Sequence, residues 1–210
     1  MDIFVERAMD RESKQEVCTL ERDVFQREMG LTLPPLDTED GSFQLIARTG
    51  PGEPAVGVVT VVNTTLDLEV HRRYGNHIVE GKRSARYTRL AVRREFRGLD
   101  IPLFLVYEAN RQFVQPNGFD FSWLLFAHER AKTAGLSTIF NMSPLNKKVL
   151  SEYGKCQVLL REEASASARA GNIRTARFIA ASAQIQFHPK PQLTAETGCG
   201  VDSQRAFAFV

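Results

Sequence analysis

The stretch YTRLAVRREFRGLDI, residues 87–101, decides the fold of this chain. At its start, residues 86–93 alternate apolar and polar side chains as a strand does, and Glu95 to Gly98 break the alternation. Apolar residues at helical spacing then run from Ile101 to Val114. The stretch therefore predicts a strand, a tight loop and a helix in direct succession.

The loop between this strand and this helix is a candidate phosphate site. The N-terminus of a helix leaves backbone N–H groups unpaired and carries partial positive charge, and both features attract phosphate. Gly98 would let the backbone approach a ligand closely, and Arg97 could add a charged donor. Many proteins have a plain turn with one glycine at such a place, so the residues alone leave both interpretations open.

The rest of the chain predicts strands and helices mixed around a single sheet, an α/β or α+β layer fold. Alternating or β-branched runs predict strands over residues 3–8, 43–48, 56–64, 136–142 and 156–161. Helical spacing predicts helices from the N-cap Asp10 to Met29, over 121–134 and over 144–153. We interpret residues 66–84 as a short helix plus loop, 164–183 as a helix or a mobile segment, and 206–210 as a closing strand.

The length of 210 residues suits a single domain over residues 1–210, with a core of about residues 1–162 and a C-terminal elaboration over 163–210. Apolar residues make up 43% and charged residues 25%, so the chain can build an ordinary core without a metal or a disulfide. The net charge of +2 gives no argument for a nucleic-acid or membrane partner.

The cysteines, Cys18, Cys156 and Cys199, are widely spaced and belong to no Cys/His cluster, so we expect free thiols and no metal site. The N-terminus is charged within its first residues and has no apolar signal-peptide core. The longest apolar stretches fall far short of the roughly 20 residues that span a bilayer. We therefore expect a cytoplasmic protein without a membrane span.

Two stretches resemble motifs of the GNAT acyltransferases. Leu90-Ala91-Val92, followed by Glu95-Phe96-Arg97-Gly98 and Ile101, is similar to the family's pyrophosphate loop. From Ala131 onward, Gly135, a predicted strand, Ser143-Pro144, Asn146 and Tyr153 are similar to the family's fifth strand and to the helix that bears its Asn and Tyr. The order and spacing of the two stretches agree, and together they cover about residues 86–161.

The resemblance implies a curved mixed sheet of six to seven strands with helices on both faces, whose fourth and fifth strands splay apart to admit a pantetheine arm. The backbone of Leu90, Ala91 and Val92 would pair with that arm as if it were an added strand. No tightly bound cofactor is implied, because acyl-CoA or an acyl-phosphopantetheine would be a co-substrate. The other residues that would hold the donor and its phosphates are Arg97, Gly98, Leu99, Asp100, Ile101, Pro102 and Asn146.

The resemblance also implies the chemistry. An amine would attack the thioester carbonyl directly, without a covalent enzyme intermediate, so Cys156 is expected to be a core thiol. Tyr153 would protonate the leaving thiolate as general acid, since an ordinary tyrosine pKa near 10 keeps it protonated at neutral pH. Arg89 would help to position the amine substrate. No residue is assigned as the general base, for which His71, His77 and His128 are candidates by type alone.

Three residues depart from the family pattern. Asp100 and Pro102 stand where small residues are usual, and Glu95 stands where Gln or Arg is common. Asp100 would place negative charge near a bound diphosphate, although it could instead cap the helix that starts at Ile101. Pro102 fits a first helical turn but lacks an N–H donor. These departures weigh against free CoA as the donor.

Thr88-Arg89 before Leu90 resembles the Ser/Thr-Arg of acyl-homoserine lactone synthases and N-acyl amino acid synthases, which take their acyl group from acyl carrier protein. Between His71 and Arg97 basic residues far outnumber acids, and a basic surface would attract an acidic carrier protein or the phosphates of CoA. The favoured function is N-acyl transfer to a small amine such as an amino acid. Two alternatives stay open: an acetyl-CoA-dependent N-acetyltransferase, and a catalytically inactive GNAT-like binding module.

Overall fold

A computed structural model describes residues 1–33, 42–64, 82–127, 138–151, 154–182 and 186–189, and within them the chain folds around one eight-stranded sheet. The strands are β1 (Asp2–Arg7), β2 (Phe43–Arg48), β3 (Gly57–Asn63), β4 (Ser84–Val92), β5 (Phe121–Ala127), β6 (Ser143–Ser151), β7 (Gly154–Glu162) and β8 (Gln186–Pro189). The helical segments are α1 (Arg11–Glu21), the π-helix η1 (Arg22–Glu28), the short 3₁₀ turn η2 (Arg94–Phe96), α3 (Ile101–Ala109), the π-helix η3 (Asn110–Val114) and α4 (Ala166–Ala180).

The sheet is mixed, with the strand order β6-β7-β5-β4-β3-β2-β1-β8. Strands β1 to β4 pair antiparallel in chain order, and β5, β7 and β6 form a second antiparallel group. The parallel pair β4–β5 joins the two groups, which requires the crossover that contains α3, and β8 adds to β1 in parallel. The predicted α/β fold class is confirmed, with one strand more than the six to seven expected, because β8 extends one edge.

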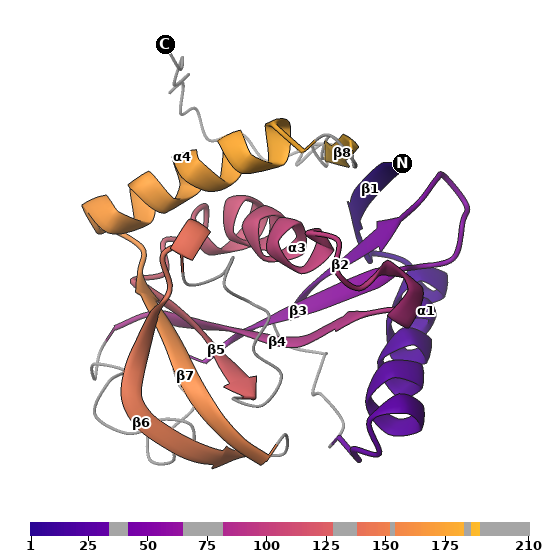
Figure 1. Cartoon of the computed structure of the whole chain (residues 1–210), viewed down its shortest axis with the longest axis horizontal. Helices are drawn as coiled ribbons and strands as arrows, with labels where there is room; N and C mark the ends of the chain where they lie inside the picture. Colours follow the sequence, from indigo (N-terminus) through magenta and orange to yellow (C-terminus); the bar gives the residue numbers. More distant parts are fainter. Residues whose placement is uncertain (34–41, 65–81, 128–137, 152–153, 183–185, 190–210) are drawn as a thin grey trace, which may run out of the picture.

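Helices cover both faces of the sheet. On one face α1 packs against β2, β3 and β4, whereas on the other face α3 packs against the same strands and is itself covered by α4 (Figure 1). Successive side chains of a strand point to opposite faces, so Ile46 of β2 packs with Val17 of α1 while Leu45 packs with Leu105 of α3. This double coverage explains why every residue of β2 is buried.

The first helix begins as the sequence predicts. Asp10 is its N-cap, and the Asp10 carboxylate accepts a hydrogen bond of 2.7 Å from the backbone N–H of Ser13. The helix continues beyond Glu21 with the wider winding of η1, and Gly30 then takes a φ of +66°, as a glycine that ends a helix does. The predicted helix from Asp10 to Met29 is therefore confirmed, with a change of winding after Glu21.

The predicted helix over residues 121–134 is wrong at its start, where Phe121–Ala127 forms β5. The sequence FSWLLFA is apolar almost throughout, and such a run does not distinguish a buried strand from a buried helix. β5 lies between β4 and β7, where Ser122 and Trp123 are fully buried. Pairing along both edges, which no local pattern reveals, decides in favour of the strand.

The elements that follow are displaced along the chain from the predicted ones. Ser143–Ser151 forms β6 instead of the predicted helix over 144–153, and Thr138 and Ile139, expected in a strand, are helical. β6 pairs antiparallel with β7, with Ser151 opposite Gly154. Pro144 suggested a first helical turn, but a proline is tolerated equally in an edge strand, which β6 is.

The C-terminal third contributes α4 and β8. α4 settles the open interpretation of residues 164–183 in favour of a helix, and its N-cap Ser165 accepts a hydrogen bond of 3.0 Å from the N–H of Ala168. β8 places a C-terminal strand beside β1, in register from Asp2 to Val5. The predicted closing strand over 206–210 and most of the segment 66–84 lie outside the described residues.

Candidate functional site

β4 and β5 pair over only part of their length. Register pairs join Ser84–Tyr87 to Phe121–Leu124, after which β4 continues to Val92 and β5 continues against β7 to Ala127. In these described stretches no further register pair connects the two strands. We call the part of β4 after Tyr87 and the part of β5 after Leu124, which do not pair with each other, the β4–β5 opening. The predicted separation concerned the strands expected over 86–93 and 136–142, and the second of these is not found, because Thr138 and Ile139 are helical. The opening lies instead between β4 and β5, and an extended ligand can add to such edges through backbone hydrogen bonds.

A β-bulge lies at the beginning of this opening. Val58 pairs with Ala91 and Thr60 pairs with Thr88, so the single residue Val59 faces both Arg89 and Leu90. The backbone of Arg89 has a φ of +51°, which is uncommon for a residue with a side chain. Bulges and strained backbone occur often at functional sites, where they redirect side chains. Here the bulge turns Arg89 toward α1, whereas Leu90 packs with the core on the α3 face.

The loop after β4, the candidate phosphate site, contains a glycine in a left-handed backbone conformation. It passes through η2 to Gly98, whose φ of +91° strongly favours glycine. A Cβ atom at Gly98 would meet no atom within 4 Å, so there is room for a side chain. Glycine is favoured here because of the backbone conformation alone. The Arg97 guanidinium donates to the Val92 carbonyl at 3.0 Å and to Glu28 at 2.6 Å. The Arg97 side chain thus closes the loop and ties it to η1.

α3 starts directly after this loop. The backbone carbonyl of Asp100 accepts the first helical hydrogen bond, from the N–H of Phe104 at 3.0 Å. The Asp100 side chain makes no capping hydrogen bond, so the prediction that it caps the helix is wrong. Partial burial raises the pKa of the Asp100 carboxyl above its usual value. Pro102 stands in the first turn as expected, next to the buried Ile101.

Of the two other predicted site residues, Asn146 is placed differently from the resemblance, and Tyr153 is not among the described residues. Asn146 belongs to β6, because the helix that was to carry it does not exist. Tyr153 lies outside the described residues, between β6 and β7. The expected roles of both residues therefore stay predictions, and the helix that suggested these roles no longer supports them. Cys156 is fully buried in β7, where a core thiol was expected.

One residue of the site, Glu21, was not recognised from the sequence. The carboxylate of Glu21, at the end of α1, accepts a hydrogen bond of 2.9 Å from the guanidinium of Arg89. The side chains of Glu21 and Arg89 are only 8% and 13% exposed. Burial raises the pKa of Glu21, and the hydrogen bond and charge of Arg89 oppose that rise. The available signal was a charged residue on the apolar stripe of Val17, Leu20 and Val24.

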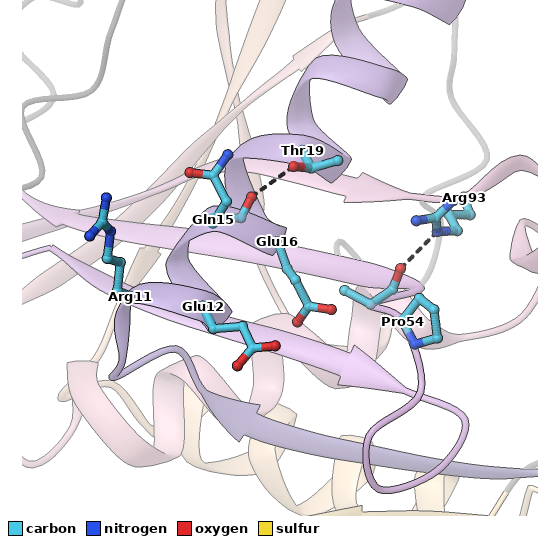
Figure 2. A pocket seen from close by; sticks show the side chains of 8 residues that line it. Arg11, Glu12, Gln15, Glu16, Thr19, Pro54 and Arg93 are labelled. Atoms are coloured by element: carbon cyan, nitrogen blue, oxygen red, sulfur yellow. Dashed lines mark hydrogen bonds between the residues drawn. The ribbon is translucent and has the colours of Figure 1, made fainter.

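An open groove with a volume of about 640 Å³ lies along α1. Figure 2 shows the side chains that line it, which come from α1, from the turn before β3 and from the residue that follows β4. Arg93 forms one wall and is fixed by a hydrogen bond of 2.7 Å from its Nε to the Ala55 carbonyl. Glu16 on the opposite wall is engaged by Arg48. The full lining is Arg11, Glu12, Gln15, Glu16, Thr19, Pro54, Ala55 and Arg93.

Neither a metal cluster nor a spanning helix is found in the part of the chain that the structure describes. No group of three or more His, Cys, Asp or Glu side chains is arranged there to hold a metal ion. None of the helices described is both long enough and apolar enough to cross a membrane.

Solved structures with a similar fold cover most of this chain. FeeM, an N-acyl amino acid synthase from uncultured soil microbes, is 10% identical with a TM-score of 0.62, over 84% of this chain and 96% of its own. BjaI, a CoA-dependent acyl-homoserine lactone synthase solved with SAM and isopentyl-CoA, is 18% identical with a TM-score of 0.55, over 88% and 92%. A GNAT-family acetyltransferase from Staphylococcus aureus Mu50 is 13% identical with a TM-score of 0.53, over 76% and 98%.

These likenesses establish the fold of the GNAT acyltransferases, which the resemblance of residues 86–161 predicted. Both synthase classes named from Thr88-Arg89 occur among the structures with that fold. No protein-family model matches the chain, and no curated protein is similar to it in sequence.

Proposed function

We propose that this protein is an N-acyltransferase that moves an acyl group from a phosphopantetheine thioester to the amine of a small molecule such as an amino acid. The observation that carries the proposal is the β4–β5 opening, which runs from Tyr87 to the loop of Gly98. It combines the two features that a phosphopantetheine needs, a strand edge from Leu90 to Val92 that β5 does not pair and, at its end, a helix N-terminus.

In this proposal the donor lies along β4. The amides of the pantetheine arm pair with the backbone of Leu90–Val92, and its phosphate meets the N–H groups between Arg97 and Ile101. The opening is closed at Tyr87 and Leu124, where β4 and β5 begin to pair. An arm that enters from the loop therefore ends at this closed end, and its thioester lies beside the bulge of Arg89.

The reaction then needs an attacking amine and a protonated leaving group. The amine nitrogen forms a C–N bond to the thioester carbonyl carbon, the C–S bond breaks, and the thiolate takes up a proton. We propose Tyr153 as the donor of that proton. Tyr153→Phe should lower kcat by about 100-fold with little change in KM for the donor. A Tyr153→Phe enzyme with the kcat of the unaltered protein would remove Tyr153 from this role.

Two sources of the thioester share this chemistry, acyl-CoA and acylated carrier protein. Asp100 and Pro102 reduce the affinity of the loop for a diphosphate, because one adds negative charge and the other lacks an N–H. The single phosphate of a carrier-protein arm is less affected by both residues. We therefore favour acyl carrier protein as donor and partner, in the cytoplasm, with a small-molecule amine as the second substrate.

The same two residues favour a second candidate function, a module that binds a thioester without turning it over. A damaged loop could retain affinity for the arm and fail to orient it for attack. Thiol release distinguishes this module from the enzyme. An acetyl-CoA-dependent N-acetyltransferase differs only in its preference for the shortest acyl chain.

The test is thermal unfolding of the full chain with acetyl-CoA, dodecanoyl-CoA and dodecanoyl carrier protein, followed by an assay of thiol release with a mixture of amino acids. A ligand at about 100 times its Kd stabilises the folded protein by roughly 2.7 kcal/mol. Stabilisation together with amine-dependent thiol release supports the enzyme, and the ranking of the three thioesters identifies the donor. Stabilisation without release supports the binding module. The absence of stabilisation by all three rejects both.

A further inference from the structure

A row of buried polar side chains crosses the α1 face of the sheet. Gln44, Thr60 and Thr88 are register partners on β2, β3 and β4, and they are 8%, 0% and 7% exposed. The Gln44 amide donates to the Thr60 hydroxyl at 3.3 Å. Buried polar groups cost free energy unless they are paired, so an apolar row would be the cheaper way to fill this space.

The neighbouring row on the same face is apolar. Ile46, Val58 and Ala91 are also register partners on β2, β3 and β4, and they pack against the apolar side chains of α1. The polar row is therefore confined to one level of the sheet. On β4 this level is occupied by Thr88, which is the first residue after the last β4–β5 register pair.

Glu21 lies over the polar row. One oxygen of its carboxylate, Oε2, is bound to Arg89 at 2.9 Å. The other oxygen, Oε1, is buried and accepts no hydrogen bond of normal length from the described residues, although the Thr60 hydroxyl is near enough to lower the pKa of Glu21. A buried carboxylate oxygen that no donor among the described residues satisfies is suited to accept a hydrogen bond from a ligand.

The backbone around Glu21 is adapted at the same level. The helix changes from α to π winding directly after Glu21, and π-helical turns are frequent at functional sites. The partner Arg89 has the positive φ of the bulge. Both elements thus depart from regular geometry where they bring these two side chains together, beside the closed end of the β4–β5 opening.

We propose that Glu21 is the general base of the transfer, with Arg89 as the residue that positions it. This inference rests on the proposed acyl transfer. The acceptor arrives as an ammonium ion, and a Glu21 oxygen takes one proton from it, directly or through one water. The freed amine attacks the thioester carbonyl, the C–N bond forms, and the thiolate leaves with a proton from the general acid. The second amine proton returns to solvent when the amide forms.

The charges that surround Glu21 suit this role. α1 packs against β2, β3 and β4, and of the charged side chains described on those strands Arg89 of β4 faces Glu21. Arg48 of β2 lies further toward the start of α1 and pairs with Glu16 and Glu6. Burial raises the pKa of Glu21 and so makes the carboxylate a stronger proton acceptor than an exposed glutamate, while the hydrogen bond and charge of Arg89 favour its ionised form.

Glu21→Gln tests the proposal. Glutamine keeps the size and an acceptor oxygen for Arg89 but cannot take a proton. The assay uses whichever of acetyl-CoA, dodecanoyl-CoA and dodecanoyl carrier protein stabilises the protein most, with the mixture of amino acids as acceptors. We expect unchanged stabilisation by the donor and a fall in kcat of at least about 100-fold, the usual contribution of a general base.

The pH profile separates catalysis from a structural role. In the unaltered protein kcat/KM for the acceptor should rise at acidic pH, as Glu21 ionises, and then become constant. In Glu21→Gln it should rise in proportion to the free amine, with an apparent pKa equal to that of the acceptor ammonium. Glu162→Gln, at an exposed glutamate of β7, is the control and should keep the kcat and the profile of the unaltered protein.

The outcomes are distinguishable. If the unaltered protein releases thiol and Glu21→Gln does so with the same kcat and profile, the assignment of Glu21 is wrong and the acyltransferase stands. If Glu21→Gln loses both turnover and donor-induced stabilisation, its role is structural and the assignment is again wrong. If the unaltered protein neither binds nor cleaves any of the thioesters, the proposed function is wrong, and the assignment of Glu21, which depends on it, is wrong as well.

Discussion

Arg89 combines an uncommon backbone conformation with a buried ion pair. Its φ of +51° is compatible with an arginine only because the surrounding structure stabilises it, and the contact with Glu21 is part of that stabilisation. Breaking a buried pair by removing one partner leaves an uncompensated charge. The residue thus connects the geometry of the bulge to the stability of the fold.

Arg89→Ala should lower the free energy of unfolding by about 3–5 kcal/mol at neutral pH. Without Arg89 the pKa of Glu21, already raised by burial, rises further. An acid whose pKa is raised by folding is tolerated below its unfolded pKa and penalised as the pH rises through its folded pKa. The loss should therefore be smallest in acid. Urea unfolding at several pH values measures it, and Arg89→Ala with Glu21→Gln should recover most of it.

Gly98 makes a second prediction at the scale of the residue. Gly98→Ala should lower the free energy of unfolding by about 1–2 kcal/mol, because alanine is strained at a φ of +91° while its methyl group meets no neighbour. It should also weaken the binding of a thioester donor, since the loop backbone shifts. Gly30→Ala, at a φ of +66°, is the control. Equal donor affinity in both variants would separate Gly98 from the donor site.

The residues of the candidate site differ in how well the sequence predicts them. Gly98 and Thr88-Arg89 stood within a stretch whose pattern of strand, loop and helix is local, and so their placement could be predicted. Glu21 could not be predicted as a site residue, because only its contact with Arg89 distinguishes it, and Arg89 is distant along the chain. The polar row of Gln44, Thr60 and Thr88 could not be predicted either, because these residues become neighbours only when β2, β3 and β4 pair.

At the scale of the element, prediction succeeded where periodicity was strong. The span of β2 was predicted correctly, and α1 with η1 followed from the spacing of its apolar residues and the cap at Asp10. β5 and β6 were mistaken for helices because each is defined by its pairing with β7. The motif assigned to Asn146 and Tyr153 depended on that mistaken helix, so the roles of both residues lose that support and stay predictions.

Gly171 on α4 makes a prediction for the packing of elements. A Cβ atom there would lie 2.7 Å from the carbonyl oxygen of Phe140, closer than real contacts allow. Gly171→Ala should therefore destabilise the protein by about 1–3 kcal/mol, despite the gain in helix propensity of up to about 1 kcal/mol. Ala170→Ser on the exposed side of α4 should change stability by less than about 0.5 kcal/mol. Chemical unfolding compares them; a stabilised Gly171→Ala would show that α4 can move away from Phe140.

At the scale of the whole molecule the sheet consists of two antiparallel groups, β8-β1-β2-β3-β4 and β5-β7-β6, joined by the four register pairs from Ser84 to Tyr87. The general α/β layer fold could be predicted from composition and the mixture of elements. The eighth strand could not, because β8 is short and is stabilised by β1 from the other end of the chain.

Binding of the donor should change amide hydrogen exchange next to the β4–β5 opening. Amide hydrogen exchange, followed by mass spectrometry, should slow in residues 90–92 of β4 when the best-binding thioester is added, because the arm pairs with an edge that β5 does not pair. Exchange in β2, which is paired on both edges already, should stay unchanged. Equal slowing in both strands would indicate general stabilisation and contradict a donor site in the opening.

The incomplete pairing of β4 and β5 also has a consequence for regulation. Under the proposed function, the thiol product carries the same arm as the thioester and makes the same backbone hydrogen bonds to β4. Spent and charged donors then compete for one strand edge with similar affinity. The rate of the enzyme would follow the ratio of charged to spent donor in the cell, so the chain would slow down as acyl groups run short, without a separate regulatory site.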